Sequence, residues 1–177
     1  ASGGAMDWQA LLADVEAQAE SWAERDRHLM AADHTRLEMR AVPTSQRFAG
    51  SMGSMVWCLI SPDDTVSGYV DAVGKDWVLL TDSHSRAETL IALDHVVAVR
   101  GLADQARALS TSAIVDSLDV MWALQRISRE RSRVRLNLVG GTVTSGIINR
   151  VGADHVLITG SQEQLVQAKA ITHIARL

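Results

Sequence analysis

Five arginines are crowded between residues 126 and 135, and they are the side chains of this sequence with the clearest chemistry. A guanidinium group carries a permanent charge and a fork of donors that matches the oxygens of a phosphate. The run therefore predicts a site for a polyanion such as RNA. The competing interpretation is a solvated helix end, because cations near a helix C-terminus suit the helix dipole. The run consists of Arg126, Arg129, Arg131, Arg133 and Arg135.

The charge distribution restricts such a site to the second half of the chain. The whole sequence carries a net charge of −4, which argues against a protein that is basic all over. Residues 6–102 hold 15 acidic and eight basic side chains, whereas residues 103–177 hold six acidic and nine basic ones. Lys169 lies in this basic half, and we add it to the predicted nucleic-acid-binding residues.

No catalytic motif accompanies the arginines. The sequence contains no Gly-x-Ser-x-Gly, no Walker motif and no Gly-x-Gly-x-x-Gly. The six histidines form no helical i, i+4 pair and no cluster with Cys58, the single cysteine, so no metal site is predicted. We therefore expect a non-enzymatic protein without a cofactor. Cys58, Trp57 and Trp77 stand in strand-like segments and are expected in the core, although an exposed Trp77 would be able to stack on a base.

A long helix is predicted over residues 6–42, after residues 1–5, which look like a cloning scar. Apolar residues recur there at spacings of four and three, as on a heptad stripe. The stripe has no obvious partner within the chain, so it predicts a homodimer through the N-terminal helix or a docking surface for other proteins. Acidic residues in the segment exclude a secretion signal, and a cytoplasmic protein is expected. The stripe consists of Trp8, Leu12, Val15 and Trp22.

The sequence also excludes a membrane-spanning helix, because no stretch approaches the roughly 20 apolar residues that a bilayer requires. No membrane insertion is therefore expected.

A repeat organises the rest of the chain. Residues 68–80 and 146–158 align without a gap at an offset of 78, with identity at six of 13 positions. Strand-like runs precede and follow both copies, and a glycine inside each copy is typical of a sharp bend. Each copy is expected to form about five short strands closed into a small SH3- or Sm-like barrel. The identical pairs are Gly68/Gly146, Val73/Val151, Gly74/Gly152, Asp76/Asp154, Val78/Val156 and Leu79/Leu157.

The predicted fold is mainly β with helices. Two SH3/Sm-like β-barrels stand in tandem, at residues 43–102 and 133–177, with the long N-terminal helix before them and a connecting helix in residues 103–132. The connecting helix is expected to begin at a Thr111/Ser112 cap. Its apolar residues should cover one barrel, which is too small to bury a sufficient core alone. These residues are Ile114, Leu118, Met121 and Trp122.

Two stretches of the second copy carry a family resemblance. They are Leu124-Gln-Arg-Ile-Ser-Arg-Glu-Arg-Ser-Arg-Val-Arg-Leu-Asn-Leu-Val-Gly-Gly141, followed by Ser145-Gly146, and the tail Lys169-Ala-Ile-Thr-His-Ile174. These stretches resemble the bacterial Sm-like RNA chaperones of the Hfq type. The first copy is similar only through the repeat. The whole chain also resembles a poorly characterised actinobacterial family that is often labelled automatically as Fis-type transcriptional regulators, although the sequence shows no helix-turn-helix pair.

The resemblance implies an Sm-like fold and a regulatory function associated with RNA. It does not transfer the Sm RNA pocket residue by residue. Gly152 stands where Sm proteins carry Asp, Val156 replaces their Asn, and Lys169 takes the place of the Hfq histidine, while the first copy has Gly74 and Val78. We expect a non-enzymatic, RNA-associated regulatory protein. The alternative is a protein–protein adaptor that uses the barrels and the N-terminal helix without binding RNA, because fold alone does not decide function.

Overall fold

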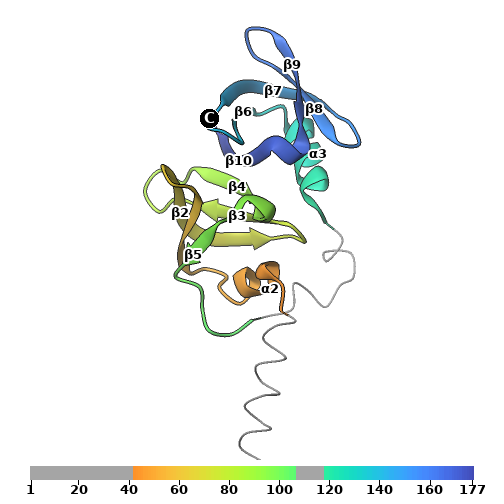
Figure 1. Ribbon diagram of the computed structural model, residues 1–177. Helices are drawn as coiled ribbons and strands as arrows, with labels where there is room; N and C mark the ends of the chain where they lie inside the picture. Colours follow the sequence, from red (N-terminus) through yellow and green to blue (C-terminus); the bar gives the residue numbers. More distant parts are fainter. Residues whose placement is uncertain (1–41, 107–117) are drawn as a thin grey trace, which may run out of the picture. The chain divides into compact units, whose positions relative to one another are not determined.

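The computed structural model describes residues 42–106 and 118–177 and is mainly β (Figure 1). We call residues 43–106 the N-terminal half and residues 118–177 the C-terminal half. In the N-terminal half, helix α2 (Thr44–Ala49) precedes β1 (Met55–Ser61), β2 (Asp64–Val73), β3 (Trp77–Thr81), β4 (Glu88–Ala92), the 3₁₀ turn η1 (Leu93–His95) and β5 (Ala98–Arg100). In the C-terminal half, helix α3 (Val120–Glu130) precedes β6 (Arg133–Leu138), β7 (Val143–Val151), β8 (His155–Thr159), β9 (Glu163–Gln167), the 3₁₀ turn η3 (Ala168–Ala170) and β10 (Ile171–Arg176).

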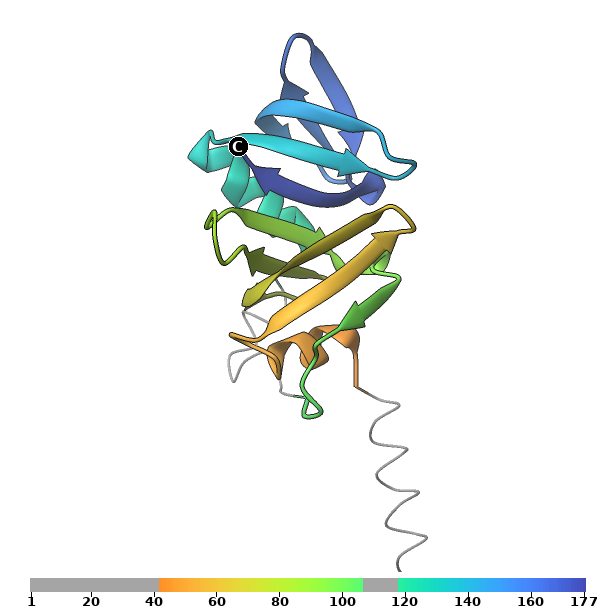
Figure 2. The same ribbon diagram turned by 90° about the vertical axis from the view of Figure 1, so that its left-hand side faces the viewer.

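All ten of these strands belong to one open antiparallel sheet in the order β5-β1-β2-β3-β4-β10-β6-β7-β8-β9. The halves join where β4 pairs with β10, which Figure 2 shows as green beside dark blue. The prediction of two closed barrels is therefore wrong. β10 pairs with β6 along one edge and with β4 along the other. Its second edge therefore forms backbone hydrogen bonds with a strand of the N-terminal half instead of closing a barrel within the C-terminal half.

Strand pairing confirms the predicted repeat at an offset of 78. Val56 pairs with Gly68 in the N-terminal half, and Val134 pairs with Gly146 in the C-terminal half. The irregularities repeat as well, because the register shifts at the same repeat position between β2 and β3 as between β7 and β8. The two halves therefore have the same strand order, register and bulge.

The offset between equivalent residues of the two halves falls from 78 to 75 residues after the third strand of each half. The loop between β3 and β4 covers residues 82–87, whereas the loop between β8 and β9 covers only residues 160–162. At the new offset, the pairing of β8 with β9 matches that of β3 with β4. The pairing of β10 with β6 likewise matches that of β5 with β1. β9 is therefore the counterpart of β4, and β10 is the counterpart of β5.

Each half has its own hydrophobic core, and β4 contributes to both. Leu90 and Ile91 are neighbours in β4, and their side chains enter different cores because successive residues of a strand face opposite ways. The N-terminal core contains Phe48, Val56, Cys58, Ile60, Val70, Val78, Leu80 and Ile91. The C-terminal core contains Trp77, Leu90, Ala123, Leu124, Val134, Leu136, Ile148, Val156, Ile158, Val166, Ile171 and Ile174.

Helix α3 differs from the helix predicted in residues 103–132. It begins at Val120, where the Asp119 side chain caps it by accepting a backbone hydrogen bond from the first turn. Leu118 precedes the helix and is not part of it. The predicted cap at Thr111/Ser112 lies outside the described residues, as does Ile114. The structure therefore corrects the start of this helix.

The long helix predicted over residues 6–42 lies outside the described residues apart from Val42, so the dimer predicted from it stays a prediction. The same holds for its stripe. The helices that the structure describes are short, and α2 was not predicted. Its Phe48 is fully buried and fills the N-terminal core. The predicted partner-binding residues outside the described part are Trp8, Leu12, Val15 and Trp22.

Two of the three strand residues predicted in the core are buried. Cys58 and Trp77 are 0% and 7% exposed, and burial raises the pKa of the Cys58 thiol to about 11. Trp57 is 45% exposed, so the prediction that it lies in the core is wrong. It pairs with Arg100 of β5 on the outer face of β1, where no described helix covers it.

Candidate nucleic-acid interface

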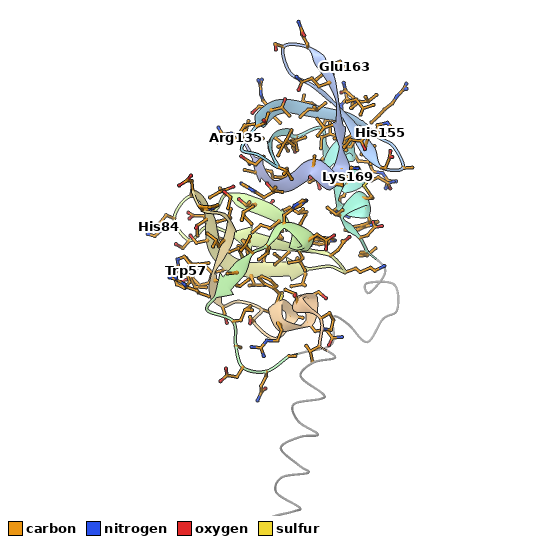
Figure 3. All side chains as sticks on the ribbon, in the orientation of Figure 1. Trp57, His84, Arg135, His155, Glu163 and Lys169 are labelled. Carbon is orange, nitrogen blue, oxygen red and sulfur yellow. The ribbon has the colours of Figure 1, made fainter. Side chains whose placement is uncertain are left out.

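Strand β6 places two of the predicted arginines on one surface. Val134 and Leu136 of this strand are fully buried in the C-terminal core. Arg133 and Arg135 alternate with them, so both guanidinium groups extend from the outer face. Two residues of strand span about 6.6 Å, which is the spacing of the two arginines along β6. Figure 3 shows Arg135 at the surface of this half.

The end of α3 brings two more arginines to the start of β6. Arg129 lies exposed in the last turn of the helix. Arg131 ends the helix in the left-handed region at φ 55°, and its backbone N–H donates to the Ser128 carbonyl at 3.2 Å. This C-cap turns the chain directly into β6 at Arg133. We call Arg129, Arg131, Arg133 and Arg135 the arginine surface.

Ion pairing separates Arg126 from the arginine surface. Its Nε atom lies 3.7 Å from Oε1 of Glu130, one helical turn later. Glu130 also contacts Arg176, which in turn lies 2.9 Å from Glu88 of β4. Within the part of the chain that the structure describes, no carboxylate lies within 4.0 Å of a guanidinium group of the arginine surface. Its charges are therefore not neutralised by described neighbours.

The two halves carry opposite net charges. Residues 118–177 hold eight basic and four acidic side chains, whereas residues 43–106 hold four basic and eight acidic ones. The arginine surface thus lies on the half with the positive excess, where the potential attracts an anion.

Lys169 is not brought to the arginine surface. It lies in η3, and β10 runs from there antiparallel to β6. Ile171 pairs with Leu138, at the end of β6 that is remote from Arg133. About 20 Å of strand therefore separates Lys169 from the α3 corner. In Figure 3 the two labelled residues Lys169 and Arg135 also lie on different sides of the half.

A hydrogen bond from the N-terminal half positions α3, and with it the arginine surface. Oδ1 of Asp76, in the turn between β2 and β3, accepts the Val120 backbone N–H at 2.7 Å. Burial raises the pKa of Asp76, and the hydrogen bond from Val120 opposes this rise. The indole Nε1 of Trp77 donates to the Leu118 carbonyl at 3.0 Å. Both hydrogen bonds link the start of α3 to the N-terminal half, at the beginning of β3.

A cavity of about 280 Å³ lies between α3 and the β4–β10 junction. Trp77 and Trp122 stack beside it, with ring centroids 6.4 Å apart and planes 15° apart. The charged groups among its lining residues are already paired with one another, so a charged ligand would have to displace an ion pair. Sequence reasoning missed this cavity because its walls come from both halves and no local pattern joins them.

His173 is a buried titratable group at the same junction. It is 7% exposed and lies in β10, between Ile91 of β4 and Asn137 of β6. Burial lowers the pKa of the imidazole, while Asp64, 3.7 Å away, partly opposes this shift. The neutral form is therefore favoured in the folded protein.

We predict that His173 makes stability depend on pH. Because its pKa is lower folded than unfolded, its contribution is complete above about pH 6.5, the ordinary value, and is lost as the pH falls through the folded-state pKa. Urea unfolding followed across this range should show a steeper loss for the wild type than for His173→Gln. His84→Gln, at an exposed loop position, is the control and should retain the wild-type slope. Equal slopes for all three proteins would contradict the assignment.

Comparison with known proteins places no further constraint on this site. No protein-family profile and no curated protein matches the sequence. Across residues 42–106 and 118–177, no three His, Cys, Asp or Glu side chains gather in a way that could hold a metal ion. None of the helices described there is long and apolar enough to cross a membrane. The function therefore has to be argued from the arginine surface itself.

Proposed function

We propose that this chain is a non-enzymatic, RNA-associated protein that binds the phosphate backbone through its arginine surface. The observation that carries the proposal is a set of four exposed arginines without described carboxylate partners. Arginine forms bidentate, charge-assisted hydrogen bonds with phosphate oxygens. The positive excess of residues 118–177 supports binding at this place although the whole chain is acidic.

The composition of the surface predicts how RNA is bound. Arg133 and Arg135 occupy the outer face of a strand, and Asn137 follows at the next outward position. None of these three side chains is aromatic, so the outer face of β6 offers no ring on which a base can stack. Contacts with phosphate position a nucleic acid without reading its sequence. We therefore expect binding with little sequence preference and a strong dependence on salt.

Removal of two arginines should weaken RNA binding and its salt dependence together. For Arg133→Gln/Arg135→Gln, the slope of log K against log salt with a single-stranded RNA should fall in magnitude by about 1.4, because each phosphate contact with a single strand contributes roughly 0.7. Filter binding or fluorescence anisotropy at several salt concentrations measures this change.

Two exposed arginines elsewhere provide the matched control. Arg86→Gln/Arg150→Gln removes the same charge from the loop before β4 and from the end of β7. This variant should retain most of the affinity and of the slope. Equal losses in both double variants would mean that only net charge matters. Failure of the wild type to bind RNA at low salt would overturn the proposal.

A protein adaptor is the second candidate, and exposed aromatic residues on the N-terminal half favour it. Trp57 and Tyr69 are 45% and 44% exposed. Trp57 lines a pocket of about 450 Å³ with Leu59, Thr65 and Arg100. Exposed aromatic anchors of this kind are enriched in protein interfaces. Partners that remain bound after nuclease treatment, and that are lost with Trp57→Ala but not with Arg133→Gln/Arg135→Gln, would favour the adaptor.

A further inference from the structure

The cavity between α3 and the β4–β10 junction has apolar walls that are only partly covered. Trp122 is 37% exposed, and Leu79 and Ile127 are half-buried. Beneath them, the buried side chains of Leu90 and Ile174 belong to the C-terminal core. Apolar surface that stays in contact with water is unfavourable. A ligand that covers these side chains would therefore be stabilised by their burial.

The volume and the walls of the cavity define the size and shape of such a ligand. The cavity holds about 280 Å³, near the lower end of the range for small-molecule pockets. An apolar cavity of about 150 Å³ takes a single benzene ring, so this one has room for a fused pair of rings. The near-parallel rings of Trp77 and Trp122 both line it. Since aromatic rings pack well on one another, these walls favour a flat aromatic ligand.

The charged residues of the cavity disfavour an ionic ligand. The Arg176 guanidinium contacts both Glu88 and Glu130, and Glu130 also lies 3.7 Å from Arg126. These charged side chains are more exposed than the apolar ones, so they form the rim. The two acidic and two basic groups carry no net charge together, so the rim attracts neither an anion nor a cation.

Arg126 still offers hydrogen-bond donors at this rim. Within the part of the chain that the structure describes, only its Nε atom lies within 4.0 Å of a carboxylate oxygen. The two terminal nitrogens of a guanidinium group carry further N–H donors. An uncharged oxygen can accept a hydrogen bond from them while the pair with Glu130 stays intact.

We propose that this cavity binds a small, uncharged, planar aromatic ligand that carries a carbonyl or hydroxyl oxygen. The ring system lies beside Trp77 and Trp122 and covers Leu79 and Ile127, and the oxygen accepts a hydrogen bond from Arg126. Because α3 supplies one wall and strands of both halves supply the other, the bound ligand strengthens the contact between them. Binding should therefore also raise the melting temperature.

Methyl naphthyl ketone is a suitable probe, because it has a fused pair of rings, no charge and a carbonyl oxygen. In a proton–nitrogen correlation NMR spectrum of the full chain, the ketone should shift the indole signals of Trp77 and Trp122. The signal of Trp57 is the internal control, since Trp57 does not line the cavity. Single Trp→Phe variants assign the three signals. Shifts of Trp57 as large as the other two, or no shift up to the solubility limit of the ketone, would overturn the proposal.

Related ligands separate charge from hydrogen bonding. Naphthoate has the same rings with a carboxylate and should bind about tenfold more weakly than the ketone, because it has to displace an ion pair. Arg126→Met should weaken ketone binding by about tenfold, the usual effect of losing a hydrogen bond to a charged group, and should leave the binding of naphthalene unchanged. Naphthoate that binds as tightly as the ketone, or an equal effect of the substitution on ketone and naphthalene, would overturn the assigned ligand class.

Leu79→Phe fills the cavity, and Leu157→Phe at the same repeat position is the matched control. Both leucines are half-buried in the third strand of their half, but Leu157 does not line the cavity. Leu79→Phe should weaken ketone binding by about tenfold or more, and Leu157→Phe by less than about twofold. Similar losses in both variants would overturn the proposal. If Leu79→Phe does not fold, the indole shifts of the wild type and the Arg126→Met comparison decide the question. RNA binding plays no part in these measurements.

Discussion

Replacing Trp77 with alanine is expected to lower the free energy of unfolding by about 3–5 kcal/mol, the usual cost of removing a buried aromatic side chain. Trp77 lies in β3 of the N-terminal half, yet its side chain is 7% exposed within the C-terminal core. It stacks on Trp122 and donates to the Leu118 carbonyl at 3.0 Å. The substitution removes the packing that holds α3 to both halves at once.

Trp57 provides the matched control for this experiment. It is the same residue type, in strand β1 of the same half, and it is 45% exposed. Trp57→Ala should cost clearly less, about 1–2 kcal/mol, because only about half of its side chain is removed from water. Urea unfolding followed by far-ultraviolet circular dichroism compares the two variants without relying on tryptophan fluorescence. Similar losses in both would contradict the burial of Trp77 beneath α3.

The same glycine-to-alanine change should have unequal effects at the two repeat positions. At Gly146, an added Cβ would overlap the Thr159 carbonyl group, whose carbon lies 2.6 Å away. At Gly68, the nearest atom is the Thr81 carbonyl oxygen at 3.0 Å. We expect Gly146→Ala to cost about 1–3 kcal/mol or more, because backbone must move, and Gly68→Ala to cost about 1 kcal/mol or less.

Calorimetry of the two alanine variants measures this difference directly. In a chain of this size a loss of 1 kcal/mol lowers Tm by about 2–4 °C, so the two melting temperatures should be separated clearly. Each variant is the control for the other, since both place the same group at the same repeat position. A Gly68→Ala variant as unstable as Gly146→Ala would contradict the closer approach of backbone atoms at Gly146.

The repeat was the most reliable part of the sequence prediction. Glycines at equivalent positions, such as Gly68 and Gly146, marked the place where each half bends, and the strand register agrees with the alignment. The prediction of closed barrels failed because alternation of apolar residues shows which face of a strand is buried, not which strand pairs with its edge. Adjacent Leu90 and Ile91 were the available signal, since burial on both faces is typical of a strand between two packed layers.

The candidate site was predictable only where it depends on local geometry. Alternation along a strand was enough to place Arg133 and Arg135 on one face. The i, i+4 spacing to Glu130 was also visible in the sequence, although the prediction kept Arg126 in the set. The position of Lys169 depends on the antiparallel pairing of β10 with β6, which no local pattern specifies. The opposite environments of Trp57 and Trp77 depend in the same way on where α3 lies.

The β4–β10 pairing also bears on how the chain folds. Most pairings in the sheet join consecutive strands across a short loop, but this one joins residues 88–92 to residues 171–176. Contacts so far apart in sequence are costly in loop-closure entropy and form slowly. Until they form, β4 accepts β10 from another chain in the same register as its own. Refolding at high protein concentration should therefore favour domain-swapped species, in which halves exchanged between chains complete each other's sheet.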